Sequence, residues 1–226
     1  MNILFFGDSI TLGYGLAHEE DRFSSVVCRM LGAQELNAGA TGTLIAAAGM
    51  SRDNGSAFVH RMHALPKADK IIVFGATNDY YWTDGPLGEA EPASEEEGSF
   101  TGAMTLLCRF LLQSYSPRDI VFLTPYRQRG IGWETRPDGT KEVTQHPTSA
   151  PNASGCALLD YVNAICTICE RFSIPVLDLY DGLPWRVDTS DRDLAAYTQD
   201  GCHPNVNGNT EIALALLDFL RSNRLV

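Results

Sequence analysis

The sequence has no long run of apolar residues. No stretch approaches the roughly 18 consecutive apolar residues that a transmembrane helix needs, so we expect no integral membrane protein. The N-terminus, Met1-Asn2-Ile3, leads directly into a strand-like pattern. It has neither the basic region nor the small-residue cleavage site of a signal peptide. These absences predict a cytoplasmic protein.

Basic residues are also scarce. The 226-residue chain has 17 Lys and Arg against 28 Asp and Glu, which gives a formal net charge of -11. Nucleic acids and anionic membrane surfaces attract clustered Lys and Arg, so this balance argues against both as partners. We expect a small-molecule ester as the partner, and the sequence leaves homo-oligomerisation open.

Cysteines and nucleotide-binding glycine motifs are the remaining absences. Six cysteines in a chain of this length do not make a disulfide framework, and several lie in helix-like apolar patterns, as buried free thiols do. No Walker-type or Rossmann glycine signature is present, which argues against a nucleotide cofactor. We therefore expect a protein of a reducing compartment that works without a cofactor.

Short apolar runs alternate with segments of helical periodicity along the chain. The best runs are continuous for about four to six residues, which suits parallel strands covered on both faces. Strands alternating with helices predict one doubly wound α/β domain over residues 1–226. The expected strands are Ile3–Phe6, Glu35–Asn37, Lys70–Gly75, Asp119–Thr124 and Pro175–Asp178, and the expected helices are Arg22–Leu31, Phe100–Tyr115, Ala157–Phe172 and Asn209–Leu220.

Two segments break this alternation. Thr83–Ser99 is rich in Gly, Pro and Glu, and Tyr126–Ala150 is long, polar and carries Trp133 among several arginines. Loops of this length inside a compact domain tend to be functional or mobile. Each is a candidate lid, substrate wall or interface, and the acidic one is equally well explained as a solvated excursion.

Reactive side chains gather just after the predicted strands. Ser9 follows the first strand, the block Asn37–Thr43 follows the second, Gly75–Asp79 follows the third, and Asp200–Gly208 precedes the last helix. In an open parallel sheet, residues beyond the carboxyl ends of different strands converge on one ligand-binding edge. We therefore expect these four segments to meet.

Together these segments fit attack on an ester carbonyl. A hydroxyl becomes nucleophilic beside an imidazole, so Ser9 and His203 are a candidate nucleophile and base, and Asp200 is placed to orient the ring. Candidate donors to the oxyanion are the backbone N–H groups of Ser9 and Gly42 and the side-chain amide of Asn78. Taken alone, Ser9 would be a helix cap and Asn78 a turn residue.

The blocks "GDSIT", "NAGATGT", "GATND" and "DGCHPN" resemble the SGNH hydrolase superfamily, also called the GDSL esterase/lipase family. They occur in the family's order and span residues 7–204. The resemblance implies a flavodoxin-like three-layer α/β/α sandwich with a mainly parallel sheet of about five strands. It further implies a triad of Ser9, Asp200 and His203, with an oxyanion hole formed by Ser9, Gly42 and Asn78. The one departure is "GATND", in which Asn78 and Asp79 still match.

Other candidate sites are weaker. His60 and His63, in "HRMH", have the spacing of a metal-binding pair but lack an evident third ligand, so we expect solvated helix residues and no metal. Cys166 and Cys169 have CxxC spacing within a helical apolar pattern, which argues against a redox motif. Cys202 is interpreted as a bystander beside the histidine. We further expect Asp8 to orient the serine turn and Asp79 to cap a helix or support the Asn78 loop.

The sequence therefore predicts a serine esterase that cleaves a small acyl oxygen ester, with acetyl as the simplest acyl group and a carbohydrate as a candidate alcohol. Tyr80, Tyr81, Trp82 and Trp133 are candidates for an aromatic substrate wall, and core packing is the alternative for the first three. The rival functions are a lipase, lysophospholipase or thioesterase of the same superfamily, an acyltransferase, and a non-catalytic carbohydrate-binding module.

Overall fold

A five-stranded parallel sheet forms the centre of the protein in a computed structural model, which describes residues 1–47, 57–82, 85–89, 95–135 and 141–226. The side chains of residues 131–135 and 141–146 lie outside this description. The strand order is β2-β1-β3-β4-β7, and every neighbouring pair is parallel. This is the flavodoxin-like doubly wound order, so the predicted fold class is confirmed. The strands are β1 (Asn2–Gly7), β2 (Gln34–Gly39), β3 (Lys70–Phe74), β4 (Ile120–Leu123) and β7 (Val176–Leu177).

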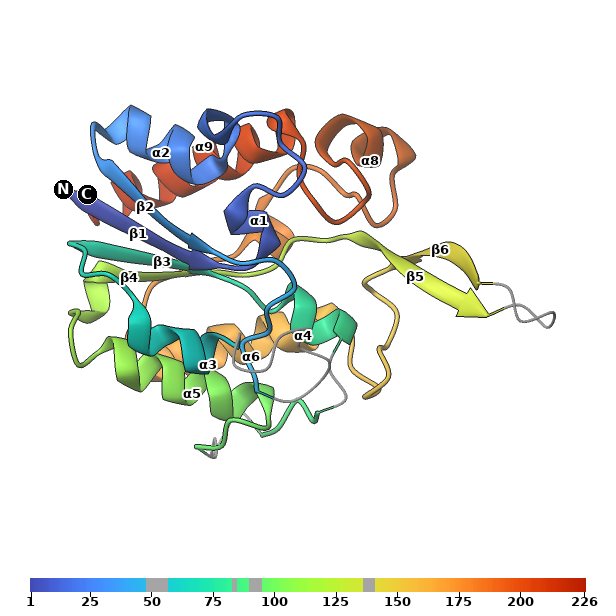
Figure 1. The fold of residues 1–226 in the computed structure, drawn as a ribbon, viewed down its shortest axis with the longest axis horizontal. Helices are drawn as coiled ribbons and strands as arrows, with labels where there is room; N and C mark the ends of the chain where they lie inside the picture. Colours follow the sequence, from blue (N-terminus) through green and yellow to red (C-terminus); the bar gives the residue numbers. More distant parts are fainter. Residues whose placement is uncertain (48–56, 83–84, 90–94, 136–140) are drawn as a thin grey trace.

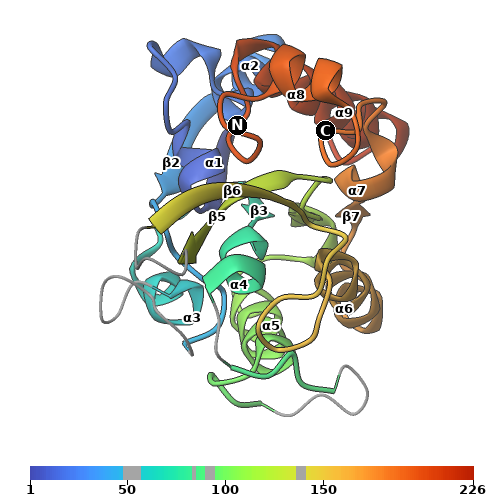
Figure 2. The same cartoon turned by 90° about the vertical axis from the view of Figure 1, so that its right-hand side faces the viewer.

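Helices cover both faces of this sheet (Figures 1 and 2). One layer contains α2 (Phe23–Leu31), α8 (Asp191–Tyr197) and α9 (Val206–Ser222). The opposite layer contains α3 (Phe58–Arg61), α4 (Thr77–Trp82), α5 (Phe100–Leu111) and α6 (Leu158–Arg171). Two four-residue helices follow strand ends, α1 (Ser9–Leu12) after β1 and α7 (Leu179–Gly182) after β7, and 3-10 turns span Glu19–Asp21, Met62–Ala64 and Pro117–Asp119.

The continuous apolar strands bury residues on both faces, as their pattern predicts. In β1, Ile3 and Phe5 enter the core under α2 and α9, whereas Leu4 and Phe6 enter the core under α5 and α6. All four side chains are fully buried. Complete burial of such a side chain contributes about 1.5–3 kcal/mol, so the helices on each face are needed to cover the strands.

The helix boundaries differ slightly from those that the periodicity predicts. Helix α9 begins at Val206, three residues before the expected Asn209, because the Asn205 side chain accepts a hydrogen bond from the N–H of Gly208. Helix α5 ends at Leu111 rather than continuing to Tyr115. The four predicted long helices are otherwise present.

The segment 126–150 is not the irregular loop that its polar composition predicts. It forms an antiparallel ribbon of β5 (Arg129–Thr135) and β6 (Lys141–Pro147), which projects from the edge of the molecule beyond the carboxyl ends of the sheet (Figure 1). Its two strands pair with each other and not with the central sheet. It therefore lacks the long apolar runs that marked the sheet strands in the sequence.

The cysteines are all free, and the CxxC pair Cys166 and Cys169 lies on α6, with Cys169 buried. In the described part of the chain, no helix has both the length and the apolar character needed to cross a membrane.

Candidate active site

The turn after β1 presents Ser9 at the carboxyl edge of the sheet. The strand ends at Gly7, and the Asp8 carboxylate caps α1 by accepting a hydrogen bond from the N–H of Ile10 (2.9 Å). A side chain at Gly7 would clash with Thr11 and with the backbone of β3, so glycine here permits α1 to lie close against the sheet. Ser9 is the first residue of α1 and is 5% exposed.

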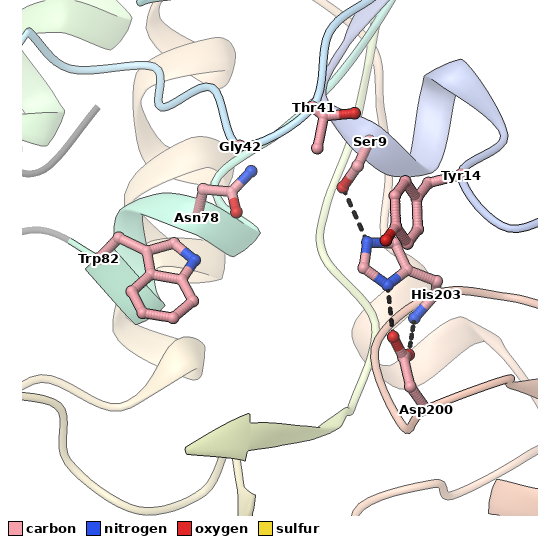
Figure 3. A pocket seen from close by; sticks show the side chains of 8 residues that line it. All are labelled: Ser9, Tyr14, Thr41, Gly42, Asn78, Trp82, Asp200 and His203. Atoms are coloured by element: carbon pink, nitrogen blue, oxygen red, sulfur yellow. Dashed lines mark hydrogen bonds and ion pairs between the residues drawn. The ribbon is translucent and has the colours of Figure 1, made fainter. Parts of the chain in front are cut away.

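His203 reaches Ser9 from a turn near the other end of the chain (Figure 3). Its Nε2 lies 2.9 Å from Oγ of Ser9, and its Nδ1 lies 2.7 Å from Oδ2 of Asp200. The carboxylate favours the tautomer with the proton on Nδ1, which leaves Nε2 able to accept a proton from the hydroxyl. The structure thus brings together the three residues that the sequence predicts as a triad.

The turn around Asp200 is closed by its own hydrogen bonds. Oδ1 of Asp200 accepts from the backbone N–H groups of His203 (2.7 Å) and Cys202 (2.9 Å). Burial alone would raise the pKa of this carboxyl, but the hydrogen bonds from His203 and Cys202 and the His203 charge outweigh it and hold the pKa below its ordinary value. The carboxylate is therefore ionised over the whole neutral range.

The segment between β4 and β5 holds this turn in place. Tyr126 donates its hydroxyl hydrogen bond to the carbonyl of Cys202, and the N–H of Arg129 donates to the carbonyl of Gly201 (3.0 Å). Gly201 has φ of +89°, and a side chain there would clash with the Arg129 carbonyl. Gln128 is fully buried; it accepts from Sγ of Cys202 (3.7 Å) and donates to Oγ1 of Thr77 at the start of α4 (3.3 Å).

These supporting residues were missed by sequence reasoning. Gln128 and Tyr126 lie in a segment that looks like a polar loop, and nothing in the sequence says which of its side chains turn inward. The interpretation of Cys202 as a bystander agrees with its contacts, because its thiol faces Gln128.

The second side of the site is built by the loop after β2 and by α4. Gly42 has φ of +72°, a conformation that favours glycine, and it lies in open space. Asn78, on α4, donates from Nδ2 to the carbonyl of Thr43 (3.1 Å) and approaches Oδ2 of Asp8 (3.5 Å). Gly39, by contrast, belongs to β2 and packs against the backbone of α1.

Asp79 anchors the same loop from below. Its buried carboxylate accepts from the N–H groups of Ile45 (2.9 Å) and Ala46 (3.0 Å), so it supports the loop after β2 and not a loop around Asn78, which lies with it on α4. Burial raises the pKa of Asp79 to about 7, although these hydrogen bonds oppose the shift. Burial likewise raises the pKa of Asp8 to about 6, although the hydrogen bond from the N–H of Ile10 opposes this shift. Two buried carboxyls thus lie beneath the site.

A pocket of about 240 Å³ opens between these two sides (Figure 3). Tyr14, which the sequence analysis did not single out, stands over the imidazole with its ring centre 4.7 Å from that of His203, and it is 52% exposed. Trp82 lies across the pocket from it. The lining residues are Ser9, Tyr14, Thr41, Gly42, Asn78, Trp82, Asp200 and His203.

Two of the four residues predicted for the aromatic wall, Tyr80 and Tyr81, pack in the interior instead. Tyr80 is buried, and its hydroxyl donates to the carbonyl of Ala150 (2.8 Å). Tyr81 packs on the Tyr80 ring with its hydroxyl buried close to Gly130. Neither lines the pocket, because successive helix positions point about 100° apart and only Trp82 of the three faces it. The Trp133 side chain lies outside the described residues.

The histidine pair of "HRMH" does not form a metal site among the described residues, which hold no group of three metal-ligating side chains. His60 is exposed, and its Nε2 lies 3.2 Å from Oε2 of Glu97. His63 packs against the ring of Phe110.

Comparison with known proteins agrees with this geometry. Residues 5–210 match the GDSL-like Lipase/Acylhydrolase family. The chain belongs to this family. It is therefore an ester-hydrolysing enzyme, and the resemblance seen in its sequence blocks is confirmed. A comparison with curated proteins finds no match.

Solved structures share the whole fold of this GDSL-like enzyme. A protein from Lactobacillus plantarum is 27% identical with a TM-score of 0.78, over 98% of this chain and 96% of that chain. A possible lipase from Chitinophaga pinensis is 21% identical with a TM-score of 0.72, over 100% and 99% of the two chains. The acetyl xylan esterase AlAXEase is 17% identical with a TM-score of 0.60, over 96% and 98%.

Proposed function

We propose that this GDSL-like enzyme is a serine esterase that removes a small acyl group, most simply acetyl, from an oxygen ester, with Ser9, His203 and Asp200 as its triad. The observation that carries the proposal is the hydrogen-bonded series from Oγ of Ser9 through both nitrogens of His203 to Asp200, at 2.9 and 2.7 Å. A hydroxyl, a base and an orienting carboxylate in this order are the parts that acyl transfer through a covalent intermediate needs.

The reaction follows from these positions. Oγ of Ser9 attacks the ester carbonyl while Nε2 of His203 takes its proton. The resulting tetrahedral intermediate collapses, the bond to the alcohol breaks, and His203 returns the proton to the departing oxygen. Water then enters, gives a proton to His203 and attacks the acyl-serine. In a second collapse the bond between the acyl carbon and Oγ breaks, the carboxylic acid leaves, and His203 returns the proton to Oγ of Ser9.

The negative oxygen of each tetrahedral intermediate is stabilised by three donors: the N–H groups of Ser9 and Gly42 and the side-chain amide of Asn78. The amide carries two hydrogens. One is donated to the Thr43 carbonyl (3.1 Å), which fixes the orientation of the side chain, and the other is directed toward Oδ2 of Asp8 at 3.5 Å, a long contact that the substrate oxygen would replace. Donors held in this way need no reorganisation as charge develops, which is the source of their effect on rate.

The pocket favours a small acyl group and a ring-shaped alcohol. Apart from the rings of Tyr14 and Trp82, its described lining is polar or small, and no described residue extends it into an apolar channel for a long acyl chain. An aromatic ring offers a flat apolar surface with polar groups at its edge, which suits the face of a sugar. The acetyl xylan esterase AlAXEase, which has the same fold, supports an acetylated sugar as the substrate class.

A substrate panel tests the proposal. The wild-type enzyme and Ser9→Ala are assayed with acetylated sugars, short p-nitrophenyl esters, acyl thioesters and lysolipids. We expect release of acetate from the sugars and short esters, and loss of both hydrolysis and fluorophosphonate labelling in Ser9→Ala. Preference for lysolipids or thioesters would replace the proposed substrate class. Binding of sugars without turnover or labelling would favour a carbohydrate-binding module.

An acyltransferase shares the first half of this reaction, because an alcohol replaces water only in the second half. Product analysis in the presence of a free sugar separates the two. Acetic acid as the product supports the esterase, and an acetylated acceptor formed in excess of acid supports the transferase.

A further inference from the structure

Arg61, the residue between His60 and Met62 in "HRMH", turns inward from the end of α3. Its guanidinium lies over the rings of Phe6 (4.9 Å) and Phe58 (5.4 Å), so it packs against the sheet. In the motif with the spacing of a metal-binding pair, it is therefore the arginine, and not the histidines, that enters the interior beneath the active site.

The guanidinium forms hydrogen bonds to three separate segments of the chain. Nη1 donates to the carbonyl of Gly7 (3.1 Å) and to Oγ1 of Thr43 (3.0 Å), and Nη2 donates to the carbonyl of Ala38. Gly7 is the last residue of β1, Ala38 lies near the end of β2, and Thr43 lies in the loop that carries Gly42. A planar guanidinium can bond to acceptors in several fixed directions at once, which an ammonium group does less well.

These acceptors lead directly to the groups that would stabilise the oxyanion. The carbonyl of Thr43 accepts a hydrogen bond from the Asn78 amide (3.1 Å). The hydroxyl of Thr43 donates to the carbonyl of Ala40 (2.9 Å) at the start of the loop. Gly7 is two residues before Ser9 on the other side. Arg61 is thus one residue away, through Thr43, from both Gly42 and Asn78.

Charge supports the same connection. The Asp8 carboxylate, which caps the Ser9 turn, interacts electrostatically with Arg61 and with His203, and Asp79 interacts with it from α4. Burial lowers the pKa of Arg61, and the Asp8 charge opposes that shift. The arginine therefore places a positive charge near the buried carboxyl of Asp8, which in turn interacts with the buried carboxyl of Asp79.

We propose that Arg61 is a positioning residue that fixes the turn after β1 and the loop after β2 relative to each other, so that the Ser9 and Gly42 N–H groups and the Asn78 amide are aimed at the same oxygen. The proposal rests on the proposed function, because it assigns Arg61 a role in stabilising the oxyanion of that reaction. It predicts that loss of Arg61 weakens binding of the tetrahedral intermediate more than binding of the ester.

Arg61→Met and Arg61→Lys test this prediction. We measure kcat and KM for a short p-nitrophenyl ester, the inhibition constant of phenylboronic acid, which forms a tetrahedral adduct with a reactive serine, and the melting temperature. In Arg61→Met we expect kcat to fall about 10- to 100-fold, the range for small displacements of reacting groups, with KM within about twofold. The boronic acid inhibition constant should rise in parallel with the loss of kcat, and Arg61→Lys should recover part of both.

A second pair of variants tests the same connection without removing a buried charge. Thr43→Val deletes the hydroxyl that Nη1 contacts, whereas Thr43→Ser keeps it. We expect Thr43→Val to lower kcat and weaken boronic acid binding, and Thr43→Ser to resemble the wild type. This pair decides the question if Arg61→Met does not fold. Arg109→Met is the matched control, because Arg109 is 56% exposed on α5 and pairs with Glu95.

Wild-type kcat and boronic acid affinity in Arg61→Met, or in Thr43→Val when only that variant folds, would overturn the proposal. So would a lower melting temperature with both kinetic values unchanged, which would leave Arg61 a structural role alone. Failure of the proposed function looks different: the wild type would not hydrolyse the ester, or Ser9→Ala would retain its activity.

Discussion

Nδ1 of His203 lies 2.7 Å from Oδ2 of Asp200, and the other oxygen of the same carboxylate accepts the backbone N–H of the histidine. The proposed base and the group proposed to orient it therefore belong to one turn, three residues apart, and each fixes the other. Ser9 has only to be brought to Nε2, which the parallel sheet and the packing of α9 against α2 achieve.

The orienting carboxylate can be tested by Asp200→Asn. An amide that donates toward Nδ1 favours the opposite tautomer, which leaves Nε2 protonated and unable to accept from Ser9. We expect kcat to fall about 10⁴-fold with little change in KM, by analogy with orienting carboxylates in other triads. Steady-state kinetics with a short ester measure this. Asp218→Asn, an exposed change on α9, is the control. A loss below about tenfold would argue against the triad, because that is far smaller than the expected effect.

The oxyanion hole can be tested by Asn78→Ala. Removal of one preorganised donor lowers kcat by about 10²–10³, and KM should change little because the ester carbonyl carries less charge than the intermediate. Asn207→Ala, which alters an exposed amide, should keep the wild-type rate. An unchanged kcat in Asn78→Ala would remove this residue from the site.

Tyr14 offers a test of substrate choice. Replacing the ring by Ala should raise KM for an acetylated sugar about 2- to 12-fold, the equivalent of about 0.5–1.5 kcal/mol for one aromatic contact, and Tyr14→Phe should retain the affinity. KM for a small acyclic ester should change less, because it does not reach the ring. The Tyr14 side chain is half exposed, so we expect the melting temperature to stay within a few degrees. Equal effects on both substrates would contradict a role in sugar binding.

The raised pKa of Asp79 allows us to predict how the stability of the protein depends on pH. Its pKa is raised to about 7 in the folded protein by burial, whereas an unfolded aspartate has a pKa of about 3.9. The folded protein keeps this proton where the unfolded chain has released it, so the free energy of unfolding should fall as the pH rises from about 4 to about 7. Asp8, with a pKa of about 6, acts in the same direction. Asp200, whose pKa is lowered in the folded protein, stabilises the fold while it is ionised. This stabilisation is lost only below about pH 4.

Urea unfolding at pH 5 and pH 8 measures this effect. We expect the wild type to be more stable at pH 5, by an amount on the order of a few kcal/mol, since each pKa unit corresponds to about 1.36 kcal/mol. Asp79→Asn cannot titrate and should reduce the difference. The same pH dependence in wild type and variant would show that Asp79 is ionised throughout.

The parts predicted correctly from the sequence are those with strong local signals. The continuous run around Phe5 favours a strand buried on both faces, and the ends of such strands place Ser9 and Asn78 on one edge of the sheet. The ribbon β5–β6 could not be predicted in this way, because its strands lie outside the central sheet and lack that apolar run.

The direction in which side chains point is the second feature that could not be predicted from the sequence. Tyr80 and Trp82 are equally aromatic and two positions apart, yet one packs in the core and the other lines the pocket. Arg61 lies between an exposed histidine and a buried methionine, and its inward course depends on acceptors at the ends of two strands that are far away in sequence. Composition and spacing contain no information on such partners.

The hydroxyl of Ser9 and the imidazole of His203, its proposed base, are 194 residues apart in the chain. A ribosome adds about 5–20 residues per second, so the histidine emerges roughly 10–40 s after the serine. During that time a nascent chain carries the serine without its proposed base. On the proposed mechanism, hydrolytic activity begins only when the turn around His203 docks, and a chain released before that point would leave the esters around it intact.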